Sequence, residues 1–111
     1  MSKLVRHKVI SIIENSGKTV LYHQEYDKKK QYQLLLNKLK EEVEEVADTE
    51  VSNAEDDLHL IEELADVYEV MLAILNSKGY NIYNVEYMAK IKRNTRGDFD
   101  SFYVLDEVRE K

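Results

Sequence analysis

The sequence predicts an all-α protein, a helical bundle that contains two long antiparallel helices. The chain of 111 residues has no proline and only three glycines, so it holds few residues that interrupt helices. The glycines Gly17, Gly79 and Gly97 each follow a segment whose apolar residues recur every three or four positions. That spacing is typical of helices with one buried face. The chain has the length of one domain, so we expect residues 1–111 to form a single domain.

The first helix is expected over about residues 5–15, where four apolar residues at helical spacing precede Gly17. Residues 19–22 are β-branched or aromatic, which favours a short extended segment. The tail alternates loosely between apolar and polar residues. We therefore expect a small two-stranded β element from residues near 19–22 and 102–105.

Each of the three later helices is preceded by a side chain that can accept hydrogen bonds from the first helical turn. The second helix is expected to be the first long one, and the third to be its long antiparallel partner. These helices are expected to follow Asp27 as far as about Asp48, to follow Ser52, Asn53 or Asp56 as far as about Ser77, and to follow Asn81 as far as about Arg96.

Composition argues against several classes of protein. The formal net charge is −6, whereas nucleic-acid and anionic-membrane binders need an excess of cationic surface. The chain has no cysteine, so it has neither disulfides nor thiolate metal ligands. No apolar run approaches the length of a membrane span, and the first residues lack the apolar stretch of a signal peptide. We expect a cytoplasmic protein that binds neither nucleic acid nor membrane.

Four carboxylates carry the strongest indication of function. Glu42 and Glu45 lie in the first long helix, and Glu63 and Asp66 lie in the second. Each pair has i, i+3 spacing, so both members point the same way. Packed side by side, the two helices could bring together four oxygen ligands of the kind that Mg²⁺ and Mn²⁺ favour. The alternative is an ordinary solvated acidic surface, but the second helix is apolar nearly all round, and buried carboxylates need a cation or hydrogen bonds.

The order of these motifs, Glu-x-x-Glu followed by Glu-Glu-Leu-Ala-Asp, resembles the MazG-type all-α nucleoside triphosphate pyrophosphohydrolases. Three further segments resemble a bacterial and phage subgroup that is similar to phosphoribosyl-ATP pyrophosphohydrolases: Lys3–Val9, Ser16–Val20 and Lys92–Phe99. Two residues depart from the subgroup's pattern. His7 stands where aspartate is usual, and Asp98 stands where glycine is usual.

The resemblance implies that water attacks the α-phosphorus of a nucleoside triphosphate, giving a monophosphate and pyrophosphate. By motif position, Mg²⁺, or Mn²⁺ in its place, would be held by Glu42, Glu45, Glu63 and Asp66. Glu42 or Glu45 would also act as the catalytic base. Phosphate would be bound by cationic residues of the resembling segments, namely Arg6, Lys8, Lys92, Arg93 and Arg96. The basic residues near Arg96 also suit a helix C-terminus without any ligand.

Two other functions stay open at this point. One is the phosphoribosyl-ATP pyrophosphohydrolase of histidine biosynthesis, and the other is an acidic helical protein that binds a nucleotide or a basic partner without turnover. His59 lies four residues before Glu63, but we expect a surface histidine there. The second long helix has more apolar surface than one small protomer can cover, so we expect a homodimer or homotetramer.

Overall fold

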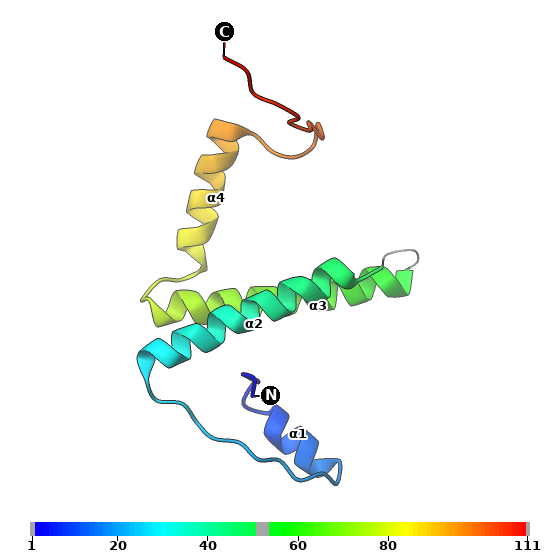
Figure 1. The fold of residues 1–111 in the computed structure, drawn as a ribbon, viewed down its shortest axis with the longest axis vertical. Helices are drawn as coiled ribbons and strands as arrows, with labels where there is room; N and C mark the ends of the chain where they lie inside the picture. The colour runs from blue at the N-terminus through cyan, green and yellow to red at the C-terminus, as the bar shows by residue number, and fades with distance from the viewer. Residues whose placement is uncertain (1, 51–53, 111) are drawn as a thin grey trace. The chain divides into compact units, whose positions relative to one another are not determined.

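The structure is a computed structural model that describes residues 2–50 and 54–110. Within these residues it contains four α-helices and no strand (Figure 1). The helices are α1 (Val9–Asn15), α2 (Lys28–Asp48), α3 (Ala54–Ser77) and α4 (Ile82–Arg96). The predicted all-α class is confirmed. None of these helices combines the length and the apolar character that crossing a bilayer requires.

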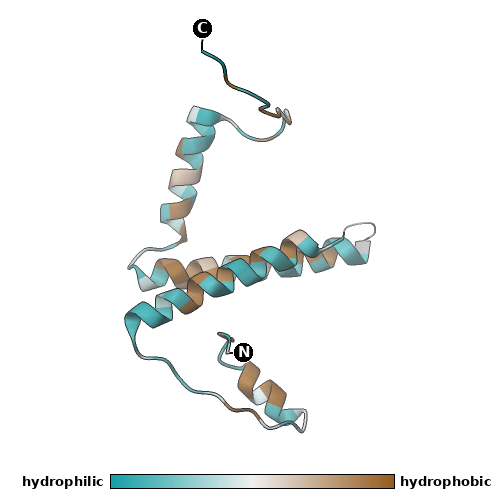
Figure 2. Ribbon diagram, viewed as in Figure 1, coloured by the Kyte–Doolittle hydropathy of each residue, from teal (hydrophilic) through white to brown (hydrophobic). Residues whose placement is uncertain are grey.

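The chain divides into two compact units, Met1–Tyr80 and Asn81–Lys111. The first unit holds α1, α2 and α3, and the second holds α4 and the C-terminal tail. The two long helices, α2 in cyan and α3 in green, lie side by side in Figure 1 and pack against each other. Apolar residues recur along both of them (Figure 2). The residues of the two acidic motifs lie on this helix pair.

The ends of α2 and α4 follow directly from their capping residues. The Asp27 side chain accepts a hydrogen bond from the Lys30 backbone N–H at 3.1 Å, and α2 ends at Asp48 as predicted. Asn81 caps α4 and forms a reciprocal capping box with Asn84. Gly97 follows α4 with a φ of 82°, a conformation that glycine adopts without steric cost.

The two sides of α3 differ sharply in exposure. The side that carries Glu63, Asp66 and Val70 meets α2, and Val70 is the one buried apolar side chain among the described residues, at 8% exposure. A second stripe lies on the opposite side, since each residue turns a helix by about 100°. This stripe, which we call the outer apolar stripe, is exposed and consists of Leu58, Ile61, Leu64 and Tyr68. The first unit therefore leaves a continuous apolar surface uncovered.

The expected β element was wrong. Residues 19–22 and 102–105 have no regular secondary structure, and Leu21 and Tyr103 are almost fully exposed. An isolated two-stranded pair is marginally stable in water unless one face packs on a core. Neither segment has such a face.

Two helix starts also differ from expectation. Helix α1 begins at Val9 instead of near residue 5, because the preceding residues contact the long helices. Asp56 lies inside the first turn of α3 and so is not its N-cap, although acidic residues there suit the helix dipole. The other two suggested caps, Ser52 and Asn53, lie outside the described residues.

Candidate metal centre

The four carboxylates of the two acidic motifs converge between α2 and α3. Glu42, Glu45, Glu63 and Asp66 each offer one oxygen, and these four atoms lie within 4.8 Å of one another. The convergence follows from the i, i+3 spacing on each helix and from the side-by-side packing of the pair. We refer to these four side chains as the acidic cluster.

Two oxygens of the acidic cluster have no hydrogen-bond partner among the described residues. They are Oε2 of Glu42 and Oε2 of Glu63, and both atoms are buried. Glu42 is only 6% exposed. A buried carboxylate oxygen without a partner is costly unless a cation or a donor satisfies it. Hard oxygen donors at this separation suit Mg²⁺ or Mn²⁺, so the residues fit the metal that the sequence suggests.

Lys38 supplies a cation at the α2 side of the cluster. Its Nζ lies 3.2 Å from Oε1 of Glu42 and 3.5 Å from Oε1 of Glu41. Burial acts to lower the pKa of Lys38, but the hydrogen bond to Glu42 and the charges of both glutamates outweigh it, and the pKa is raised. Lys38 is therefore a permanently charged neighbour of the cluster at neutral pH.

The pKa of Glu42 is raised above its ordinary value. Burial is the main cause, and the neighbouring Glu45 carboxylate adds to it, while Lys38 acts in the opposite direction. Glu42 is therefore too far from water, and too close to the Glu45 carboxylate, to carry its charge without cost. A bound divalent cation would remove that cost.

The N-terminal segment brings a second cation to the cluster. A terminal guanidinium nitrogen of Arg6 lies 2.7 Å from Oδ1 of Asp66, and Nζ of Lys3 lies 3.9 Å from Oε1 of Glu41. The segment thus contacts both long helices beside the acidic cluster. The Arg6 side chain is 57% exposed, so its ion pair contributes little to stability. Arg6 is consequently a cation that a ligand can recruit.

His59 and an open groove lie beside the acidic cluster. Nε2 of His59 lies 3.4 Å from Oε1 of Glu63, although more than half of the imidazole is exposed as expected for a surface histidine. The groove has a volume of about 350 Å³ and shares Glu45 and Glu63 with the acidic cluster. Its lining consists of Glu45, Asp48, Thr49, Glu50, Asp56, His59 and Glu63. The cluster is therefore reachable from solvent through a polar groove.

The remaining predicted phosphate ligands are exposed. Lys8 precedes α1 in the first unit, and three others lie on α4 in the second unit, namely Lys92, Arg93 and Arg96. Two of these three fall in the last turn of α4, where cations favour the helix dipole. Their role in phosphate binding stays a prediction.

The sequence analysis did not identify Lys38 as part of the site. Lys38 also pairs with Glu41, whose side chain is partly buried. The available signal was the four-residue spacing from Lys38 to Glu42, which places both on one helix face. Only the packing of α3 shows that this face is buried.

Comparison with protein families finds a match over most of the chain. The model of the phosphoribosyl-ATP pyrophosphohydrolase family matches residues 7–94. The matched range includes the whole acidic cluster and Lys38, and it continues across the boundary between the two compact units. Comparison with curated proteins and with solved structures gives no match.

The raised pKa of Glu42 predicts how the metal-free protein responds to acid. A carboxyl group whose folded pKa lies above its unfolded pKa stabilises the fold when protonated, and this contribution is lost as pH rises through the folded pKa. Lowering the pH from about 7 to about 5 should therefore raise the free energy of unfolding of the natural protein relative to Glu42→Gln. Denaturant unfolding in EDTA measures this difference. The matched control is Glu44→Gln, an exposed site on α2, and a pH-independent difference for Glu42→Gln would contradict the account.

Proposed function

Because the chain belongs to the phosphoribosyl-ATP pyrophosphohydrolase family, within the MazG-like all-α nucleotide pyrophosphohydrolases, we propose that it hydrolyses a nucleotide between the α- and β-phosphates. The resemblance noted in the sequence is thereby confirmed. The observation that carries the proposal is the convergence of Glu42, Glu45, Glu63 and Asp66 within 4.8 Å. Such a cluster is the kind of site that binds a divalent cation for phosphate chemistry.

The proposed cofactor is Mg²⁺, with Mn²⁺ as a substitute, held by the four carboxylates of the acidic cluster. When bound, such an ion lowers the pKa of water and neutralises phosphate charge. The unpartnered buried oxygens of Glu42 and Glu63 support the proposal, because a cation would satisfy both of them.

Glu45 is the better of the two candidate bases. It is exposed and lines the open groove, so its carboxylate can reach water that enters from solvent. Glu42 is buried, and Lys38 holds one of its oxygens. A general base must lie within hydrogen-bonding reach of the proton that it takes. We therefore assign proton acceptance to Glu45 and a ligand role to Glu42.

Arg6 is the proposed phosphate ligand nearest the cluster. Its guanidinium already lies beside Asp66, and this planar group suits the geometry of phosphate oxygens. The exposed cations Lys8, Lys92, Arg93 and Arg96 are proposed as further phosphate contacts, on the basis of the segments in which they lie. Pyrophosphate is the leaving group that these cations would stabilise.

Two substrate classes compete within the proposed reaction. The sequence resemblance favours a nucleoside triphosphate or a deoxynucleoside triphosphate, with a role in cleaning the nucleotide pool. The family description favours phosphoribosyl-ATP at least as strongly. Both substrates contain the same α–β phosphoanhydride bond, so a cation held by the acidic cluster could promote hydrolysis of either. A protein that binds nucleotide without turnover would share the cluster but release no pyrophosphate.

We also propose that the protein assembles at least as a homodimer through the outer apolar stripe. Leu58, Ile61, Leu64 and Tyr68 are all exposed on α3, on the side away from α2. Contiguous exposed apolar surface of this kind marks an interface in soluble proteins. A second copy offers the same stripe, which is the arrangement of a two-fold interface. A homotetramer would require a further surface.

The reaction predicts a specific isotope pattern. With Mg²⁺ in ¹⁸O-water, a panel of ATP, dCTP, dUTP and phosphoribosyl-ATP should yield pyrophosphate from at least one member. The label should appear in the nucleotide monophosphate product, because attack at the α-phosphorus leaves the new oxygen there. Mass spectrometry of both products measures it. Label in pyrophosphate would place attack at the β-phosphorus, and no cleavage in the panel would favour the binding protein.

Removal of one ligand should weaken metal binding strongly without unfolding the protein. Glu63→Gln is expected to weaken Mg²⁺ or Mn²⁺ affinity at least about 100-fold, the upper end of what losing an outer-shell partner costs. Titration calorimetry measures the affinity, and circular dichroism checks the fold. Glu69→Gln is the matched control, because Glu69 is exposed on the same helix outside the cluster. Equal affinities in the two variants would remove Glu63 from the ligand set.

Assembly can be tested on the outer apolar stripe itself. Light scattering on a size-exclusion column should show at least a dimer at micromolar concentration. Ile61→Asp should shift the protein toward a monomer, since it places a charge in an apolar interface. The control Glu69→Ala changes another exposed residue of α3 and should leave the mass unchanged. A natural protein that runs as a clean monomer would refute the proposal.

A further inference from the structure

We propose that Lys38 is a positioning residue of the metal centre: it holds one oxygen of Glu42, so that the other oxygen faces the acidic cluster. The inference rests on the proposed function, because it assumes that the cluster binds a divalent cation. In this role Lys38 does not bind the metal itself but orients Glu42, which does.

The geometry divides the two oxygens of Glu42. Oε1 lies 3.2 Å from Nζ of Lys38, whereas Oε2 is buried and has no hydrogen-bond partner among the described residues. Lys38 and Glu42 are four residues apart on α2, so the helix itself sets their approach. With Oε1 held in this way, rotation of the carboxylate is restricted. Oε2 is then presented as a ligand.

Lys38 differs from the other cations near the cluster in its burial. Its side chain is 18% exposed and that of Glu42 is 7% exposed, so salt and water screen this pair little. Arg6 is far more exposed, and its contact with Asp66 can exchange with solvent. Losing one partner of a buried ion pair leaves an uncompensated charge, which is strongly unfavourable. The Lys38–Glu42 contact is therefore a fixed part of the site.

A simple counterion and a positioning residue have opposite effects on metal affinity. A lysine close to a cation site repels the incoming cation, so removal of its charge alone should strengthen metal binding. A residue that orients a ligand should weaken binding when it is removed, as outer-shell partners of metal ligands do. The sign of the change thus separates the two roles.

The test is a calorimetric titration of the full chain with Mn²⁺ at neutral pH. Lys38→Met keeps much of the side-chain length but removes the charge and the donor. It should bind Mn²⁺ about 10- to 100-fold more weakly than the natural protein. Lys38→Arg, which restores a charged donor, should regain most of the affinity. Unchanged or tighter binding by Lys38→Met, or a Lys38→Arg variant no better than Lys38→Met, would overturn the proposal.

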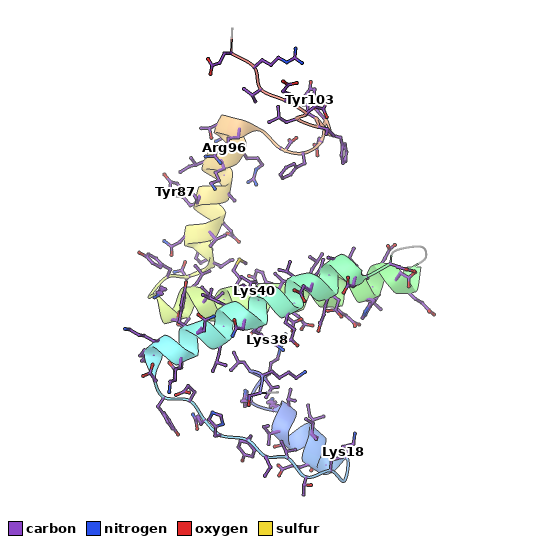
Figure 3. All side chains as sticks on the ribbon, in the orientation of Figure 1. Lys18, Lys38, Lys40, Tyr87, Arg96 and Tyr103 are labelled. Carbon is purple, nitrogen blue, oxygen red and sulfur yellow. The ribbon has the colours of Figure 1, made fainter. Side chains whose placement is uncertain are left out.

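Lys40→Met is the matched control. Lys40 is exposed on the same helix, and Figure 3 labels both lysines. Two residues turn a helix by about 200°, so Lys40 lies on a different side of α2 from Lys38. It loses the same charge without loss of a contact to Glu42, so its Mn²⁺ affinity should not fall. A fall equal to that of Lys38→Met would show a non-specific charge effect and would overturn the assignment.

The outcomes separate this inference from the proposed function. If the natural protein binds no Mn²⁺, both the metal centre and the role of Lys38 are refuted. If the natural protein binds Mn²⁺ and folded Lys38→Met binds it equally well, the assignment of Lys38 alone fails. Circular dichroism checks the fold of each variant. If Lys38→Met does not fold, Lys38→Gln takes its place and must show the same weakened binding.

Discussion

The acidic cluster is the constraint on which the rest of the first unit depends. Four carboxylates lie within 4.8 Å of one another between α2 and α3, and one of them, Glu42, is almost fully buried. Like charges at this distance repel, and burial makes each charge more costly. Lys38 and Arg6 offset part of the cost through their contacts with Glu42 and Asp66. Two buried oxygens still lack hydrogen-bond partners among the described residues, and the divalent cation that we propose would satisfy them.

The helix framework was largely predictable because its signals are local. Asp27 and Asn81 cap the helices that their sequence positions suggested, and Gly97 follows α4 as expected. The convergence of the acidic motifs could also be predicted from the sequence. The i, i+3 spacing fixes the direction of each pair, and two long amphipathic helices bury their apolar faces by packing together. These inferences needed no knowledge of distant contacts.

The features that were predicted wrongly or missed depend on tertiary packing, which the sequence does not show. The β element was inferred from residues 19–22 and 102–105, whose composition favours strands but which have no surface to cover. Lys38 was not identified from the sequence, because the burial of its side chain beside Glu42 depends on tertiary packing. The outer apolar stripe of α3 is the converse case. Its apolar pattern predicts burial, yet the first unit leaves the stripe exposed. We therefore propose that a second copy of the chain covers it.

A crystal structure of the protein grown with Mn²⁺ tests the central claim most directly, because the anomalous scattering of manganese identifies the ion. The account predicts an anomalous peak among Glu42, Glu45, Glu63 and Asp66, with carboxylate oxygens at roughly 2.0–2.6 Å, the range for hard cations. Lys38 should remain on Oε1 of Glu42. A well-ordered acidic cluster without a manganese peak, or a peak held by other residues, would contradict the account.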